Sequence, residues 1–253
     1  MESLDIAALL FLAALLAGFV DSIAGGGGLI SIPALLWAGL GPLETLATNK
    51  AQAVFGSGAA TLHFAREGAL NPRSARLPTL CTFAGAALGA LAVQRLDAGL
   101  LTRLIPLLLV GFALYVLCSP RVSDLDSRRR LSDPAFALSV GLGVGFYDGF
   151  FGPGTGTFFA LGHVALLGYN LRRATAHSKL LNFASNLAAL LVFLPGGHIA
   201  WGLAGAMAGG QALGAWIGSH LVLRHGAALI RPVLAVSSLA ISSKLLLDRF
   251  PSG

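Results

Sequence analysis

The fold is decided by the stretch GFVDSIAGGGG, from Gly18 to Gly28, which interrupts an apolar segment. Consecutive glycines do not hold a helix well, because glycine loses more backbone freedom on ordering than any other residue. A second stretch, GFYDGFFGPGTG, runs from Gly145 to Gly156 and carries a Gly-Pro-Gly break. Asp21 and Asp148 therefore each lie just before a predicted helix break. The glycines expected to form the breaks are Gly25, Gly26, Gly27 and Gly28, and Gly152, Gly154 and Gly156.

The amino-acid composition places both breaks in a membrane. Of the 253 residues, 55% are hydrophobic and only 11% are charged, whereas a soluble domain carries about 25% charged residues. Because a membrane span needs about 20 apolar residues, the chain has room for about eight to ten spans and none for a soluble catalytic domain. The composition excludes a soluble enzyme and predicts an all-α polytopic membrane protein. Irregular backbone at membrane depth is tolerated only beside protein or a watery cavity, so the breaks predict a binding site.

Apolar segments separated by short loops fill the chain. They lie at roughly 5–22, 28–40, 46–65, 77–94, 100–118, 134–151, 155–168, 174–195, 199–222 and 229–247. The longest loop, about 119–133, is rich in arginine and is the one stretch with the composition of a solvated linker. We therefore predict a single transmembrane domain, 1–253. Its first repeat spans about 1–118, its linker about 119–133 and its second repeat about 134–253.

The two halves resemble each other in sequence. The motif GFVD, which ends at Asp21, matches GFYD, which ends at Asp148. Further along, Lys50 matches Lys179 and Gly85 matches Gly214, both at one common spacing. Several matches in the same order, with one small slip between the first match and the others, indicate a duplicated unit. The small residues around Gly85 and Gly214 also suit close helix packing, and they would allow a homodimer.

The loop arginines favour a reversal of the chain at each glycine break. If each broken segment is one kinked span, the arginines divide almost evenly between the two sides. If each segment turns back, one side carries Arg66, Arg73, Arg76, Arg121, Arg128, Arg129, Arg130, Arg172, Arg173, Arg224 and Arg231, and the other carries Arg95, Arg103 and Arg249. The positive-inside rule favours the second arrangement. It predicts two inverted-topology repeats that each start with a glycine-broken or re-entrant helix pair, a cytoplasmic linker, and both termini outside.

Three lysines, Lys50, Lys179 and Lys244, lie within apolar segments rather than in loops. Lys244 lies near the end of the last segment, where snorkelling to the interface is expected. Lys50 and Lys179 occupy equivalent repeat positions. A lysine in an apolar helix is costly unless it faces a cavity or a partner; snorkelling to the interface is the alternative. Each is expected near the start of its helix, where free N–H groups and the macrodipole favour anions. Together with nearby amides and hydroxyls at helical spacing, they predict a site for a small oxyanion formed by Asn49, Lys50, Gln52, Ser57, Ser178, Lys179, Asn182 and Asn186.

Three further residues are candidates for coupling or structural roles. Asp21 and Asp148 either cap the half-helix that follows, pair with the lysines, or carry protons in a transport cycle. His177 lies beside Lys179 and is either a titrating group or an ordinary hydrogen-bonded histidine. The remaining histidines show no metal-ligand spacing, and no nucleotide-binding Gly-x-x-x-x-Gly-Lys-[Ser/Thr] motif occurs. We therefore expect no metal and no cofactor.

These motifs resemble those of the TauE/SafE family of sulfite exporters. In the first half, the resemblance rests on Asp21, AGGGGLISIP from Ala24 to Pro33, ATNK ending at Lys50, and Gly56-Ser57. In the second half, it rests on GFYDGFFGPGTG, Ser178-Lys179, Asn182 and Ser185-Asn186. The resemblance covers nearly the whole chain. It implies a multi-pass permease of the bacterial inner membrane, with substrates that include sulfite, thiosulfate and organosulfonates.

The leading hypothesis is a secondary transporter of a small anion, with a sulfur oxyanion or organosulfonate as the substrate. It would work by alternating access of the two halves, either coupled to an ion gradient or passively. Its partners would be the anion and the lipid bilayer; the net charge of +6 reflects loop arginines and predicts no nucleic-acid partner. The alternatives are a passive anion channel and an intramembrane aspartyl-type enzyme with Asp21 and Asp148 as a dyad. Because these aspartates lie just before glycine breaks rather than in a shared catalytic motif, we do not expect an enzyme.

Overall fold

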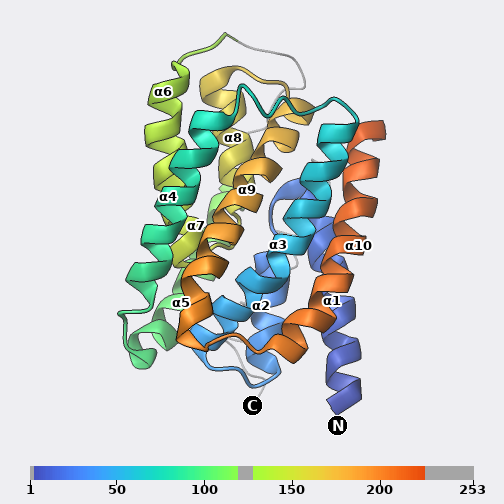
Figure 1. The fold of residues 1–253 in the computed structure, drawn as a ribbon, viewed down its shortest axis with the longest axis vertical. Helices are drawn as coiled ribbons and strands as arrows, with labels where there is room; N and C mark the ends of the chain where they lie inside the picture. Colours follow the sequence, from blue (N-terminus) through green and yellow to red (C-terminus); the bar gives the residue numbers. More distant parts are fainter. Residues whose placement is uncertain (1–2, 119–127, 226–253) are drawn as a thin grey trace.

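The computed structural model describes residues 3–118 and 128–225, and all of its secondary structure in these ranges is helical. The helices form one elongated bundle (Figure 1). In chain order they are α1 (Ser3–Ala24), α2 (Gly28–Trp37), α3 (Pro42–Arg66), α4 (Arg76–Val93), α5 (Ala98–Cys118), α6 (Asp133–Phe136), the π-helical turn η1 (Ala137–Gly141), α7 (Leu142–Phe150), α8 (Thr155–Leu167), α9 (Leu171–Phe193), the 3₁₀ turn η2 (Leu194–Gly196) and α10 (Trp201–His225). The predicted apolar segment 229–247 and linker residues 119–127 lie outside the described ranges.

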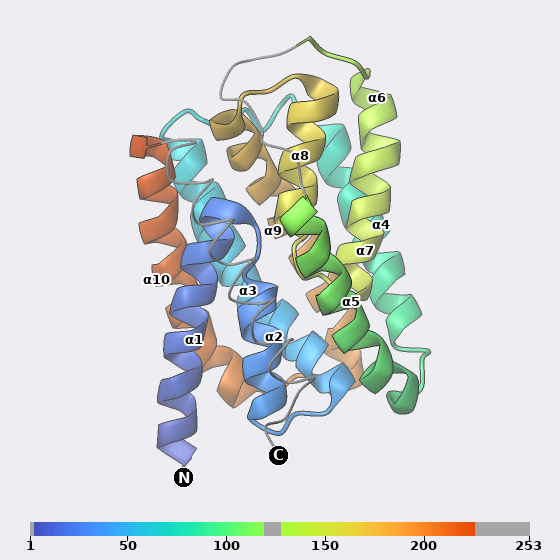
Figure 2. The same ribbon diagram turned by 180° about the vertical axis from the view of Figure 1, so that it is seen from behind.

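The chain reverses direction at the first glycine break. Helix α1 runs from one end of the bundle to about its middle, and α2 returns toward the same end (Figure 2). Gly25 has a φ of +82°, in the left-handed region that glycine adopts without the strain a Cβ would bring. The Asp21 carboxylate accepts the backbone N–H of Gly27 at 3.2 Å and so ties the turn to α1. The first break is therefore a hairpin rather than a kink.

The second glycine break forms a similar hairpin that enters from the opposite end of the bundle. Helices α6 and α7, joined by η1, run to the middle, and α8 returns (Figure 1). The Tyr147 hydroxyl donates to the carbonyl oxygen of Pro153 at 2.8 Å and holds the Gly-Pro-Gly turn. Helices α2 and α8 have 10 and 13 residues. At about 1.5 Å per residue, neither spans the roughly 30 Å hydrocarbon core.

The long helices α3 and α9 pack against each other at the centre of the bundle. Pro42 stands at the start of α3, where its fixed φ suits the first helical turn. The Asn170 side chain caps α9 by accepting the backbone N–H of Arg173 at 2.9 Å. Among the described residues, the stretches long and apolar enough to cross a membrane, by length and composition, are Asp5–Ala24, Arg76–Val93 and Leu171–Gly196. The predicted class, an all-α membrane protein, is confirmed.

Glycine faces bring α10 against α1 and α4 against α7. A Cβ on Gly214 of α10 would overlap the carbonyl oxygen of Leu15 in α1. A Cβ on Gly85 of α4 would overlap the carbonyl oxygen of Leu142 in α7. The two contacts are equivalent when the halves are aligned. The alignment matches Gly85 with Gly214, and the register of the GFVD and GFYD motifs matches Leu15 with Leu142. Each half therefore packs a glycine-rich helix closely on the first helix of the other half.

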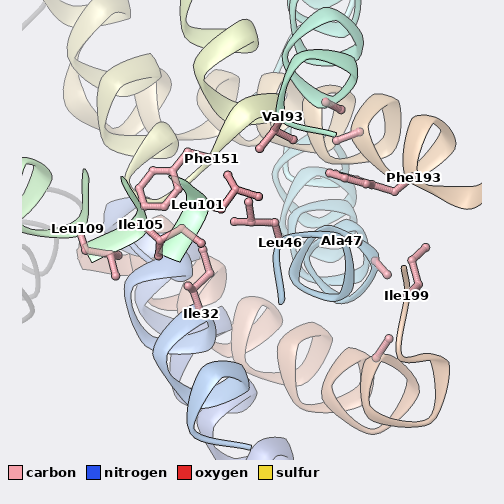
Figure 3. Close-up of a cluster of buried hydrophobic side chains, with 14 of the residues drawn as sticks. Ile32, Leu46, Ala47, Val93, Leu101, Ile105, Leu109, Phe151, Phe193 and Ile199 are labelled. Atoms are coloured by element: carbon pink, nitrogen blue, oxygen red, sulfur yellow. The ribbon is translucent and has the colours of Figure 1, made fainter. Parts of the chain in front are cut away.

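A large hydrophobic cluster packs among α2, α3, α4 and α5 (Figure 3). The connection from α4 to α5 lies on the side of the bundle where α1 begins (Figure 1). Both halves contribute to the cluster: α2 to α5 from the first half, and Phe151 and Phe193 from the second. Its members labelled in the figure are Ile32, Leu46, Ala47, Val93, Leu101, Ile105, Leu109, Phe151, Phe193 and Ile199. On this side of the bundle, the two halves therefore meet through apolar packing.

The arginines of the described residues gather at one end, which we call the arginine end. The α3–α4 loop, the start of α6, the α8–α9 loop and the end of α10 all lie there (Figure 1). It carries Arg66, Arg73, Arg76, Arg128, Arg129, Arg130, Arg172, Arg173 and Arg224. The opposite end, where α4 connects to α5, carries Arg95 and Arg103. This is the distribution expected for a chain that reverses at its glycines.

Candidate functional site

The tips of the two hairpins touch each other in the middle of the bundle. A Cβ on Gly156 would lie 2.5 Å from the Cα of Gly25, and a Cβ on Gly28 would lie 3.2 Å from the Cα of Pro153. The Thr157 hydroxyl donates to the carbonyl oxygen of Ala24 at 2.6 Å and links the tips directly. Glycine is needed here because the two backbones approach too closely for side chains.

Lys50 of α3 forms a buried ion pair with Asp148 of α7. Its Nζ lies 2.6 Å from Oδ1 of Asp148, and the two side chains are only 2% and 3% exposed. The same Nζ donates to Oδ1 of Asn186 in α9 at 3.3 Å. Asp148 is held on its other side, because Oδ1 also accepts the Thr155 hydroxyl at 3.0 Å and Oδ2 accepts the Ser185 hydroxyl. This carboxylate is therefore fixed by donors from three helices.

Lys179 of α9 forms the second ion pair, with Asp21 of α1. Its Nζ lies 3.0 Å from Oδ2 of Asp21 and 2.5 Å from the backbone carbonyl oxygen of the same residue. The Lys179 side chain is 1% exposed, but the Asp21 side chain is 17% exposed. The Asp21 pair is thus the more accessible of the two.

The two ion pairs are crossed between the halves. Each lysine pairs with the aspartate that precedes the glycine break of the other half, and neither aspartate pairs with its counterpart. Of the three interpretations left open by the sequence, the structure supports pairing with the lysines. Asp21 also accepts a turn N–H in its hairpin, so pairing and local capping coexist at that position.

A small cavity of about 30 Å³ lies between the crossed pairs and the hairpin tips. Cavities of this size hold a water molecule or two. It is lined by Asp21, Gly25, Gly28, Ser31, Asn49, Lys50, Gln52, Ala53, Asp148, Gly152, Thr155, Gly156, Asn182, Asn186 and Gln211. We call it the central cavity.

Three amide oxygens around the central cavity have no hydrogen-bond partner among the described residues. They are Oε1 of Gln52, Oδ1 of Asn182 and Oε1 of Gln211, and all are buried. Buried polar atoms are nearly always hydrogen-bonded in proteins, so each orphan calls for an explanation. A polar ligand in the central cavity would explain these atoms, because it can donate hydrogen bonds to the amide oxygens. If the ligand only accepts, an amide can turn and present its NH₂ group instead.

Most of the residues predicted for the site border the central cavity, and four do not. Asn49, Lys50, Gln52, Asn182 and Asn186 line it, as do Asp21 and Asp148. Lys179 lies behind Asp21 rather than on the cavity wall. The Ser57 and Ser178 hydroxyls donate to carbonyl oxygens of their own helices, and His177 borders a different cavity. Of the predicted break glycines, Gly25, Gly28, Gly152 and Gly156 line the central cavity, whereas Gly26, Gly27 and Gly154 do not.

The helix N-termini at the site differ from those expected. The sequence predicts that Lys50 and Lys179 lie near the starts of their helices, but α3 begins at Pro42 and α9 at Leu171, about two turns earlier. The N-termini that reach the central cavity belong to the short helices α2 and α8, which begin at Gly28 and Thr155. Apolar runs alone do not locate a helix start, and here the loops adopt helical structure before the apolar run begins.

Several cavity residues were not among the predicted site residues. Ser31 donates to Oδ1 of Asn49 at 2.6 Å, and the Gln52 amide donates to the same oxygen at 2.9 Å. Gln211 comes from α10, where it is an isolated polar residue among small and apolar ones. A lone polar residue in an apolar helix is the sequence signal that identifies Gln211 as a candidate site residue.

The fold and the site define a class of protein: a polytopic helical membrane transporter, with broken helices from both halves meeting at a buried polar site. Comparison with known proteins then gives the family. The chain belongs to the family described as Sulfite exporter TauE/SafE, whose profile matches residues 10–245.

Three relatives agree with this assignment. The chain is 49% identical to "Probable membrane transporter protein YfcA" of Escherichia coli K12, over 94% of the chain and 89% of the relative. It is 48% identical to "Probable membrane transporter protein ORF9" of a Sinorhizobium species, over 95% and 92%, and 44% identical to a "Probable membrane transporter protein" of Haemophilus influenzae, over 97% and 96%. No solved structure matches the chain significantly. The protein is a membrane transporter and not an enzyme.

Proposed function

We propose that the protein is a secondary transporter of a small anion, with a sulfur oxyanion such as sulfite or thiosulfate, or an organosulfonate, as the substrate. The observation that carries the proposal is the central cavity, where a buried lysine and the N-termini of two short helices converge. Lysine and free helix N-termini both favour anions. The family description, Sulfite exporter TauE/SafE, supports the sulfur chemistry.

The described arrangement is an occluded one in this proposal. A cavity of about 30 Å³ is smaller than a hydrated oxyanion needs, and Lys50 is already satisfied by Asp148. Transport therefore requires that the halves move apart and that an anion replaces a carboxylate beside a lysine. Because the two pairs are crossed between the halves, any relative movement of the halves changes both of them.

Charge balance suggests how the anion is coupled to an ion gradient. Two lysines and two aspartates bring a net formal charge of zero to the site. A monoanion that enters alone would leave an uncompensated buried charge, which is costly. A proton that enters with it and neutralises one aspartate removes this cost. We propose that Asp21 takes this proton, because its side chain is partly exposed and its release frees Lys179.

The first prediction concerns binding. Sulfite, thiosulfate or a short organosulfonate is expected to stabilise the purified protein in detergent against thermal unfolding, because a ligand that binds only the folded state raises its stability. At one hundred times its Kd, the ligand adds about 2.7 kcal/mol. Sulfate and acetate at equal ionic strength serve as comparisons. If none of the sulfur anions raises the unfolding temperature more than acetate does, the substrate class is wrong and only the transporter class remains.

The second prediction separates the roles of the two aspartates. Asp21→Asn is expected to keep exchange of labelled sulfite between equal concentrations across a proteoliposome membrane but to lose the acceleration caused by an imposed pH gradient. Asp148→Asn is the matched control at the equivalent repeat position, and any transport that remains in it should still respond to the gradient. A gradient response that survives in Asp21→Asn would show that this residue does not carry the coupling proton. A wild-type protein that never accumulates sulfite against its gradient would instead be a passive channel.

The orientation and symmetry of the protein form part of the same proposal. Matched contacts of Gly85 and Gly214 and hairpins that enter from opposite ends support an inverted repeat. The positive-inside rule would place the arginine end in the cytoplasm and the start of α1 outside, in the bacterial inner membrane. A homodimer remains a proposal, and the glycine faces that suggested it are occupied by α1 and α7.

A further inference from the structure

A second, larger cavity lies at the arginine end of the bundle. Its volume is about 440 Å³, and it lies between the α3–α4 loop of the first half and the α8–α9 loop of the second. It is lined by Glu67, Gly68, Ala69, Asn71, Asn170, Arg172, Arg173 and His177. We call it the outer cavity.

At the opposite end, a hydrogen bond bridges the equivalent place. There, the backbone N–H of Ala200 donates to Oγ1 of Thr48 at 3.0 Å, and Thr48 is fully buried. The alignment that matches Lys50 with Lys179 also matches Thr48 with His177 and Asn71 with Ala200. No hydrogen bond joins His177 to Asn71 among the described residues, and the outer cavity lies between their elements instead. The two ends therefore differ where the repeat would make them alike: a hydrogen bond joins the two elements at one end, and a cavity lies between them at the other.

The charge around the two places also differs: an acidic residue lies at one and two arginines lie at the other. At the end with the Thr48 hydrogen bond, the residue of α3 that corresponds to Arg173 is Glu44. At the arginine end, Arg172 and Arg173 are exposed and form no ion pair among the described residues. Arg173 is kept in place by stacking on the ring of Tyr169, with 3.8 Å between its Cζ and the ring centroid. The two arginines and Glu67 together give the lining of the outer cavity a net formal charge of +1, which suits a monoanion.

His177 adds a specific requirement for the ligand. It is 2% exposed, and its Nδ1 lies 2.9 Å from the carbonyl oxygen of Arg173. A carbonyl only accepts, so Nδ1 carries the hydrogen, and in the neutral ring Nε2 is an acceptor. Nε2 is buried and has no partner among the described residues. Because Nε2 has almost no accessible surface, a ligand in the outer cavity reaches it only after a small movement of the ring, and a ligand that then satisfies it must donate a hydrogen bond.

We propose that the outer cavity is a binding site for a small oxyanion that still carries a proton, such as hydrogen sulfite. Arg172 and Arg173 hold its charge, and Nε2 of His177 accepts its O–H. The proposal rests on the proposed function, because it makes the cavity the entry site of the transported anion. His177 and Lys179 lie on the same helix, α9, so this helix connects the outer cavity to the central site.

The outer site is tested by measuring the concentration dependence of sulfite transport from the arginine end in proteoliposomes. Arg172→Gln/Arg173→Gln is expected to raise KM about tenfold, the effect of losing roughly one charge-assisted hydrogen bond, with the maximal rate changed less than about twofold. The control is Arg73→Gln/Arg76→Gln, which removes the same charge from the same end but from residues outside the cavity wall. An equal rise in KM in both double variants would mean that only the general surface charge matters, and it would overturn the proposal. An unchanged KM in the first variant would also overturn it and leave the proposed transport intact.

Direct binding in detergent distinguishes this site from the central one and from a lipid site. Hydrogen sulfite is expected to stabilise the wild type more than Arg172→Gln/Arg173→Gln, because the variant keeps only the central site. Sulfate, which carries no proton near neutral pH, should stabilise the two proteins equally. If the wild type binds hydrogen sulfite in this way but shows no flux, the outer site stands and the proposed function fails. If only phosphatidylglycerol, and not hydrogen sulfite, stabilises the protein through these arginines, the cavity holds a lipid headgroup and the proposal is wrong.

Discussion

Replacing Lys50 by methionine is expected to abolish anion transport and to destabilise the protein by about 3 to 5 kcal/mol. Lys50 and Asp148 are 2% and 3% exposed, so the substitution leaves a buried carboxylate without its counter-charge. Thr155 and Ser185 still donate to that carboxylate, but they do not neutralise it. Equilibrium unfolding in detergent micelles measures the stability, and labelled sulfite flux measures the transport.

Two variants make this prediction specific. The double change Lys50→Met/Asp148→Asn removes both charges, and it should regain most of the lost stability without regaining transport. Lys179→Met should cost less stability than Lys50→Met, because its partner Asp21 is 17% exposed and can reach water. If the double variant transports sulfite normally, Lys50 is only a structural residue, and the anion site lies elsewhere.

The substitution Gly25→Ala is expected to disrupt the contact between the two hairpin tips and so to cost both stability and transport. The new methyl group would face two penalties at once. The φ of +82° costs a non-glycine residue about 1 to 2 kcal/mol. In addition, the Cβ would overlap the backbone nitrogen of Thr157 in the opposite hairpin, and overpacking of this kind costs about 1 to 3 kcal/mol.

Gly39 provides the matched control for this effect. Its φ is +93°, but a Cβ there would have no heavy atom within 4 Å. Gly39→Ala therefore carries the backbone strain without the clash, and it should lower stability by only about 1 to 2 kcal/mol while transport continues. Equal losses in the two variants would mean that the hairpin tips do not need the close contact, and a fully active Gly25→Ala would remove the basis of the occluded site.

Much of the fold follows from the sequence because apolar run length and glycine position act locally. The segments expected at 77–94 and 155–168 correspond to α4 (Arg76–Val93) and α8 (Thr155–Leu167). The reversal at each break was favoured by the distribution of arginines, a signal that depends on which side each loop reaches. The stretch expected as one segment at 134–151 contains a π-helical turn, η1, which apolar periodicity does not reveal.

The site was harder to predict because its contacts join distant parts of the chain. The lysines and aspartates could be selected by their chemistry, but their crossed pairing depends on how the two halves pack. Chemistry and helical spacing predict Ser57 and Ser178 as site residues, yet their hydroxyls donate back to carbonyl oxygens of their own helices. Gln211 reaches the central cavity only because α10 packs against α3, near Gly56.

The central claim is that a small sulfur oxyanion crosses the membrane through a site that includes Lys50. The most direct measurement is the uptake of labelled sulfite into proteoliposomes that contain the purified protein, compared with liposomes that contain Lys50→Met/Asp148→Asn at the same density. We expect saturable uptake by the wild type and only background uptake by the variant. Uptake at the same rate in both, or no uptake of any sulfur oxyanion by the wild type, would contradict the account.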